Sequence, residues 1–92
     1  MFDSATVVRR SAHQVSCNLS EEVAILNLDS AIYFGLDTVG AHIWEALEQP
    51  RSVAELCRSV VDHFEVAPAE CETDTLKFLA SLQEAGLIEV AE

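Results

Sequence analysis

The sequence has few histidines and cysteines, the side chains that most often bind metals or act as nucleophiles, and they lie far apart along the chain. The candidates for metal binding or nucleophilic chemistry are three histidines and three cysteines: His13, His42, His63, Cys17, Cys57 and Cys71. No two cysteines have the C-x-x-C spacing of a zinc knuckle or a redox site, and their odd number gives no disulfide framework. We expect the thiols to be small hydrophobic groups, mostly buried, and we expect no metal site and no cofactor.

Two other patterns could mark a reactive site. Glu70, Glu72 and Asp74 could act as paired carboxylates, but on a helix they form more simply a solvated face. Leu28-Asp29-Ser30 is similar to the serine site at which small acidic carrier proteins bear a pantetheine, but β-forming residues follow it, which favours a hairpin turn. The three glycines are isolated and form no phosphate-binding loop. The sequence therefore predicts no catalytic residues.

The charge of the chain limits its partners. Sixteen acidic residues face five basic ones, which gives a formal net charge of −11. A surface this negative repels phosphate, so DNA, RNA and anionic lipid are disfavoured as partners. No apolar run approaches the roughly 20 residues of a membrane span and no signal segment opens the chain, so we expect a cytoplasmic protein.

The first half of the chain has the period of β-strands. Residues 13–19 alternate between apolar and polar, residues 23–28 form a second apolar run after a turn at Ser20-Glu21-Glu22, and residues 31–36 form a third after Asp29-Ser30. This predicts a three-stranded antiparallel meander. Residues 1–12 alternate only weakly, and we expect a loose N-terminal arm or an irregular edge there.

The second half has the period of helices. Asp37 or Thr38 can cap a first helix, Ser52 with Glu55 matches a capping box at the start of a second, and Pro68 suits the first turn of a third. Gly86 fits the left-handed position after a helix end, and residues 87–90 could add a short closing strand. The expected fold is a single α+β domain over residues 1–92. It has a three-stranded antiparallel sheet followed by three helices, of which the last two, with the tail, resemble a winged helix-turn-helix.

The third expected strand is unusual because it carries no charge and no proline. As the last strand of a meander it lies at an edge, and edge strands are normally protected by lysine, proline or bulges. Such a bare edge could accept a strand from a partner through backbone hydrogen bonds. Alternatively, the third helix or the tail covers it, or two copies of the chain join edge to edge.

The sequence resembles the PqqD-like family of peptide-binding domains, which recognise leader peptides of ribosomally made, post-translationally modified peptides. The resemblance extends over about residues 13–90. It is carried by residues 23–37, Val39-Gly40, Ile43-Trp44, residues 51–56 and residues 78–88.

The resemblance implies that the leader lies along the third strand as a fourth strand and that its side chains enter a groove beside the third helix. The implied peptide-binding residues are Ala31, Ile32, Tyr33, Phe34 and Gly35 in the strand, Thr75, Phe78, Leu79 and Leu82 in the groove wall, and Lys77 or Ser81 at the rim. Trp44 and Leu36 are assigned to the core.

Stand-alone domains of this size resemble the small B-type protein of lasso peptide pathways. That resemblance implies a non-catalytic chaperone that presents the precursor to a leader-cleaving cysteine protease and an asparagine-synthetase-like cyclase. Other family members serve radical-SAM enzymes, including those of a quinone cofactor pathway. A winged-helix DNA binder shares the fold outline, although Lys77 is the only base in the expected third helix, and a dimerisation module would use the same bare edge.

Overall fold

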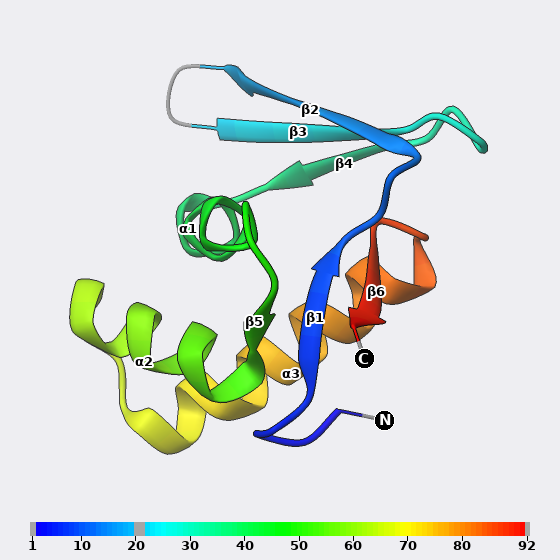
Figure 1. Ribbon diagram of the computed structural model, residues 1–92. Helices are drawn as coiled ribbons and strands as arrows, with labels where there is room; N and C mark the ends of the chain where they lie inside the picture. The colour runs from blue at the N-terminus through cyan, green and yellow to red at the C-terminus, as the bar shows by residue number, and fades with distance from the viewer. Residues whose placement is uncertain (1, 20–21, 92) are drawn as a thin grey trace.

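The computed structural model describes residues 2–19 and 22–91. Its elements are β1 (Val7–Arg10), β2 (Gln14–Leu19), β3 (Glu22–Asn27), β4 (Tyr33–Leu36), α1 (Thr38–Ala46), β5 (Arg51–Ser52), α2 (Val53–His63), α3 (Pro68–Glu84) and β6 (Ile88–Ala91). They form two antiparallel sheets with the strand orders β2-β3-β4 and β5-β1-β6. In Figure 1 the first sheet lies above α1, and α2 and α3 lie below. The expected α+β class, with a three-stranded meander and three helices, is confirmed.

The turn between β3 and β4 begins earlier and ends later than the sequence predicts. The side-chain oxygen of Asn27 accepts hydrogen bonds from the backbone N–H groups of Asp29 (2.9 Å) and Ser30 (3.2 Å). Ala31 has a φ of 59°, in the left-handed region that a strand does not use. Ala31 and Ile32 therefore belong to the turn, and the expected strand at 31–36 is corrected to β4. Most of the turn expected at residues 20–22 lies outside the described residues.

The helix boundaries follow the expected capping chemistry. Asp37 caps α1 by accepting from the N–H of Gly40 at 2.7 Å, and both hydrogen bonds of the capping box between Ser52 and Glu55 are present at the start of α2. Pro68 is the first residue of α3, and Gly86 after its end has a φ of 76°. Each local prediction of a helix start or stop is thus confirmed.

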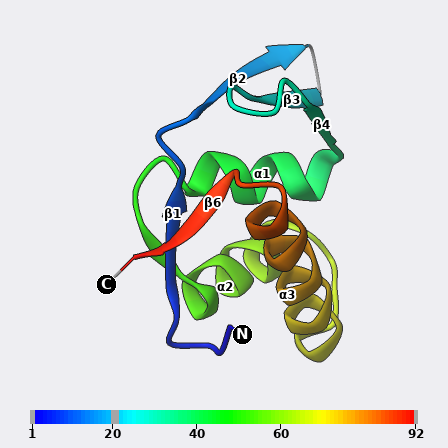
Figure 2. The same ribbon diagram turned by 90° about the vertical axis from the view of Figure 1, so that its right-hand side faces the viewer.

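The second sheet corrects the expectation of a loose arm at residues 1–12. Within that segment β1 forms the central strand of β5-β1-β6, and the side chain of Val8 has no exposed surface. Val8 pairs with Arg51 in β5 and with Val90 in β6, so both outer strands of this sheet are far from β1 in the sequence. Figure 2 shows β6 beside β1. At the end of β1, the guanidinium of Arg10 lies over the ring of Trp44, 4.5 Å from its centroid.

One apolar core joins the inner face of β2-β3-β4 to the three helices. Its fully buried large side chains are Val8, Ile25, Ile43, Trp44, Leu47, Val53, Leu56, Leu79, Leu82 and Leu87. Burying a side chain of this size stabilises the fold by about 1.5–3 kcal/mol, so these residues hold the sheet on the helices. Trp44 and Leu36 lie in this core, as expected. None of the described helices has the length and apolar composition needed to cross a membrane.

Candidate functional site

β4 is an edge strand that no other described strand covers. It pairs with β3 alone, from Leu26–Tyr33 to Val23–Leu36. The tail does not protect it, because β6 pairs with β1 in the other sheet. The Tyr33 side chain is 70% exposed, and Gly35 is exposed as well. The bare edge expected from the sequence is therefore present.

The hydrogen-bond ladder determines which backbone groups of β4 point outward. The N–H of Asn27 donates to the carbonyl of Ile32 at 3.0 Å, which makes these two residues a hydrogen-bonded pair of the β3–β4 ladder. Bonded and non-bonded pairs alternate in an antiparallel ladder, so Phe34 and Leu36 bond to β3. The N–H and C=O groups of Tyr33 and Gly35 consequently point toward the open edge, where an added strand would meet them.

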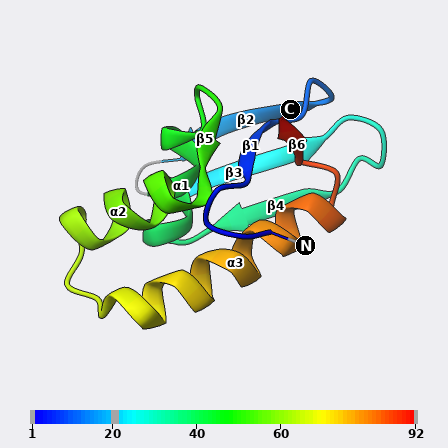
Figure 3. The ribbon, with the colours of Figure 1, turned by 60° about the horizontal axis from the view of Figure 1, so that its bottom comes forward.

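In Figure 3, α3 and β4 run in opposite directions, and two contacts connect α3 to the segments on either side of β4. At one end, a Cβ added to Gly40 in α1 would lie 3.2 Å from ring carbons of Phe78. At the other end, the side-chain N–H of Asn27 donates to the carbonyl of Ala85 at 2.6 Å. Gly40 follows the end of β4 and Asn27 precedes its start, so these contacts connect α3 to the segments at both ends of the edge strand.

The structure separates the predicted groove wall into buried and accessible residues. Leu79 and Leu82 have no exposed surface and Thr75 has 3%, so these three belong to the core stripe of α3. Phe78 packs against that core but is only half-buried, at the border of the stripe. Lys77 and Ser81 are exposed on the solvent side. Residues three and four apart on a helix share one face, so the predicted wall overlaps the core stripe, and its contact with a peptide stays a prediction.

A cleft of about 500 Å³ opens where β4 ends, between the start of α1, the α2–α3 connection and α3. It is lined by Asp37, Val39, Gly40, Ile43, Val60, Glu65, Val66, Ala67, Glu70, Cys71, Asp74, Thr75 and Phe78. We call it the α1–α3 cleft. Its lining combines apolar side chains with four carboxylates. The sequence analysis missed it because the lining comes from four separate segments; the spacing of Glu70 and Asp74, one helical turn apart, was its only local signal.

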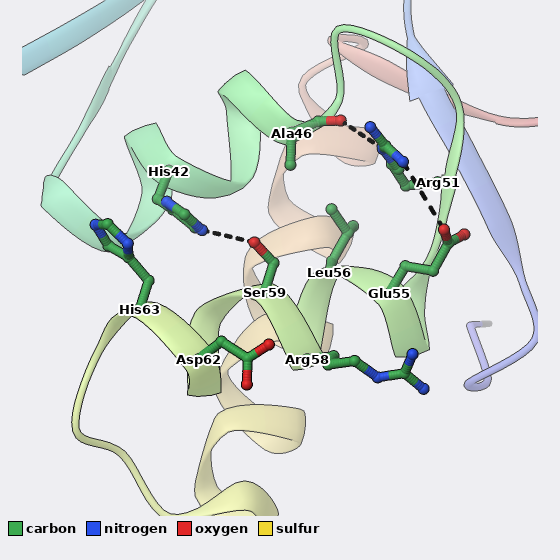
Figure 4. A pocket seen from close by; sticks show the side chains of 9 residues that line it. All are labelled: His42, Ala46, Arg51, Glu55, Leu56, Arg58, Ser59, Asp62 and His63. Carbon is green, nitrogen blue, oxygen red and sulfur yellow. Dashed lines mark hydrogen bonds and ion pairs between the residues drawn. The ribbon is translucent and has the colours of Figure 1, made fainter.

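A second cleft, of about 470 Å³, lies between α1 and α2 (Figure 4). In it, Nε2 of His42 and the hydroxyl of Ser59 are hydrogen-bonded at 2.7 Å, and the rings of His42 and His63 are stacked with centroids 4.6 Å apart. These contacts join α1 to α2. In the described part of the chain, no group of three or more His, Cys, Asp or Glu side chains could hold a metal ion. The sequence did not predict the pairing of these two histidines because they lie 21 positions apart on different helices.

The cysteines are packed differently from one another. Cys71 is buried in the core and its thiol contacts the carbonyl of Cys57 at 3.6 Å. Burial raises the pKa of the Cys57 thiol, which keeps it protonated at neutral pH and lowers its reactivity. Cys17 is exposed on β2.

Comparison with known proteins gives one family and two solved structures. Residues 22–88 match the family described as coenzyme PQQ synthesis protein D (PqqD). The structure is similar to that of TbiB1 in complex with the TbiA(beta) leader peptide, with a TM-score of 0.83 and 33% identity over 88% of this chain and 94% of that one. It also matches a lasso peptide synthetase B1 complexed with the leader peptide, with a TM-score of 0.79 and 22% identity over 89% and 96% of the two chains, which supports the fold alone. No curated protein matches the sequence.

Proposed function

The chain belongs to the PqqD family, and from this premise we propose that it binds the leader peptide of a ribosomally made precursor as a fourth strand on the free edge of β4. The observation that carries the proposal is the outward-facing backbone of Tyr33 and Gly35, because backbone pairing is the source of affinity when a strand is added to a sheet. The TbiB1 structure supports it, since that protein is 33% identical and was solved with a leader peptide.

In this arrangement the leader side chains alternate between two surfaces. Side chains on the inner face point toward Phe34 and the half-buried ring of Phe78, and those on the outer face lie beside Tyr33. Ala31 and Ile32 flank the start of the edge from the turn, and Lys77 and Ser81 are available to polar leader groups along α3. Thr75, Leu79 and Leu82 lie in the core stripe beside Phe78, and Thr75 also lines the α1–α3 cleft.

The pathway that the chain serves is a further part of the proposal. The resemblance of the sequence to the small B-type proteins of lasso peptide pathways favours a lasso peptide pathway, and a lasso peptide synthetase B1 shares the fold. The chain would then act as a non-catalytic chaperone in the cytoplasm, presenting the precursor to a leader-cleaving cysteine protease and an asparagine-synthetase-like cyclase. The description of the matched family favours one alternative, in which the same edge presents a peptide to a radical-SAM enzyme of a quinone cofactor pathway. Neither role requires a cofactor on this chain.

DNA binding through α3 is disfavoured by charge. The helix carries Glu70, Glu72, Asp74 and Glu84, with Lys77 as its only base. A recognition helix must neutralise phosphates, and this one would repel them.

Gly35 provides a direct test of strand addition. Gly35→Pro removes an N–H that points away from β3, so the β3–β4 ladder keeps its bonds while the incoming strand loses a partner and meets the proline ring. The matched control is Gly35→Ala, which keeps the N–H; nothing lies within 4 Å of the added Cβ.

The measurement is fluorescence polarisation with a labelled leader from a short precursor gene that neighbours the gene of this chain. We expect Gly35→Pro to weaken binding by at least about tenfold, consistent with a loss of roughly 1.4 kcal/mol or more, while Gly35→Ala binds like the wild type. Circular dichroism confirms that both variants fold. Equal affinity of the two folded variants would exclude β4 as the binding edge.

A further inference from the structure

We propose that the α1–α3 cleft selects leader peptides that carry lysine or arginine on the N-terminal side of the segment that pairs with β4. This inference rests on the proposed function and adds the chemical class of leader that the chain takes. It follows from where the cleft lies, from the charges around it, and from the fit of a basic side chain to its floor.

The position of the cleft determines which end of the leader reaches it. β4 runs toward the cleft, because Asp37, which lines it, directly follows the last residue of the strand. Both existing pairings in this sheet are antiparallel, and antiparallel pairs are the more common kind. A fourth strand antiparallel to β4 would therefore begin beside Leu36, and the residues that precede it would enter the α1–α3 cleft.

The charge around the cleft is uniformly negative. Its lining contains the carboxylates of Asp37, Glu65, Glu70 and Asp74 and no lysine or arginine. Asp37 is engaged as the cap of α1, whereas the other three form no ion pair within residues 2–19 and 22–91. Glu65, Glu70 and Asp74 are exposed at the rim of the cleft, so they would attract a cation as surface carboxylates do, with a modest energy that salt screens.

The floor of the cleft favours a long basic side chain over a bare metal ion. The apolar lining from Val39, Val66 and Phe78 can cover the aliphatic stem of lysine or arginine while the charged end reaches the carboxylates at the rim. A guanidinium or ammonium over the Phe78 ring would gain a cation–π contact as well. Among the described residues, no three His, Cys, Asp or Glu side chains lie close enough together to hold a metal ion, and this argues against an ion as the occupant.

The experiment selects binders from a displayed library of random 16-residue peptides. Wild-type protein and the charge-reversed variant Glu70→Lys/Asp74→Lys are used as separate baits. The matched control Glu72→Lys/Glu84→Lys makes the same change in charge on the same helix, at residues that do not line the cleft. Thermal unfolding of the three proteins checks that the fold is retained, and Gly35→Pro identifies clones that bind through β4.

Among the clones that depend on β4, we expect lysine and arginine to be enriched on the N-terminal side of a shared strand-forming segment. This enrichment should appear when the wild type or the control variant is the bait, and it should be absent when Glu70→Lys/Asp74→Lys is the bait. A synthetic peptide from such a clone should bind the reversed variant about three- to tenfold more weakly in 150 mM salt, as expected for one or two exposed ion pairs. The difference should shrink in 1 M salt, where charges are screened within about 3 Å.

Two results would overturn the inference, and they are distinguishable. Clones that require β4 but show no basic preference would leave leader binding intact and refute charge selection by the cleft. A library that yields no clone sensitive to Gly35→Pro would refute strand addition itself, and the inference with it.

Discussion

Asn27 shows how one side chain can position a binding edge. Asn27 is 8% exposed. Its side-chain oxygen accepts a hydrogen bond from the N–H of Asp29 in the turn before β4, and its side-chain N–H donates to the carbonyl of Ala85 at the end of α3. The turn and the helix are thereby fixed to the same residue. Because the strand starts where this turn ends, the distance between the open edge and α3 is determined at Asn27 at one end, and at the contact between Gly40 and Phe78 at the other.

Gly40 allows a prediction about that second contact. A methyl group at this position would lie 3.2 Å from both the Asp37 carboxylate and the Phe78 ring. Alanine is favoured over glycine in a helix by roughly 0.5–1 kcal/mol, but overpacking a well-filled site costs about 1–3 kcal/mol. Asp37 is held by its capping bond, so the ring has to move, and we expect Gly40→Ala to destabilise the protein by about 1 kcal/mol.

The measurement for Gly40→Ala is the free energy of unfolding in urea, with Gly35→Ala as the control because its added Cβ has open space around it. The displaced Phe78 ring should also weaken leader binding, which the same fluorescence assay can follow. A stabilised Gly40→Ala variant would mean that α1 and α3 are not in close contact at this point.

At the scale of elements, prediction from the sequence succeeds where the signal is local. The alternation in β2, the apolar run of β3 and the capping residues of α1 and α2 are each signals within a few positions, and the structure has these elements. The start of β4 is mispredicted because Ala31 and Ile32 are apolar and β-forming by type, whereas the side chain of Asn27 draws the backbone into a turn. The burial of the predicted wall residues is likewise set by packing. The apolar stripe of α3 is visible in the sequence, but only the packing shows that Leu79 and Leu82 face the core and Phe78 its border.

The capping box of α2 gives a prediction about pH. The backbone N–H of Ser52 donates to the Glu55 carboxylate at 3.0 Å, and this bond, with the Ser52 hydroxyl, lowers the pKa of Glu55. A carboxyl whose pKa is lower in the folded state stabilises the fold above its unfolded pKa of about 4.3, and this contribution is lost as the pH falls through the folded value. Glu55→Gln keeps the hydrogen bond without the charge.

We therefore expect Glu55→Gln to lose less stability than the wild type between about pH 5 and about pH 3. The measurement is the urea midpoint across that range, compared with Glu72→Gln, an exposed glutamate outside any capping box. Parallel pH profiles for Glu55→Gln and the wild type would show that the carboxylate does not contribute through its charge.

The whole molecule depends on pairings that no local pattern reveals. β1 is four residues long and β5 only two, and their partners lie more than 40 positions away. Strands this short have too few alternations to stand out from a loop, so the sequence pattern of residues 1–12 does not predict a central strand. The same separation hides the α1–α3 cleft, whose lining is brought together only when the helices pack around the core.

Net charge is a property of the whole molecule that lowers its stability. At −11, with only two arginine–carboxylate pairs in the described part of the chain, the fold carries unbalanced repulsion among its carboxylates. Salt screens this repulsion over about 10 Å at 0.1 M ionic strength and over shorter distances at higher salt. We therefore expect the urea midpoint to rise between 20 mM and 500 mM NaCl with little change in the slope of the transition.

The control for the salt effect is Glu72→Lys/Glu84→Lys, which removes charge without touching the α1–α3 cleft. It should be more stable than the wild type at low salt, and the gap should narrow as NaCl is added, because screening and charge removal relieve the same repulsion. If the difference in stability between the variant and the wild type does not depend on salt, the higher stability of the variant comes from local effects in the helix. A urea midpoint of the wild type that falls as salt is added would mean that attractive ion pairs outweigh the repulsion among carboxylates. The carboxylates at the rim of the cleft would then be paired within the chain, and they would not attract a basic leader.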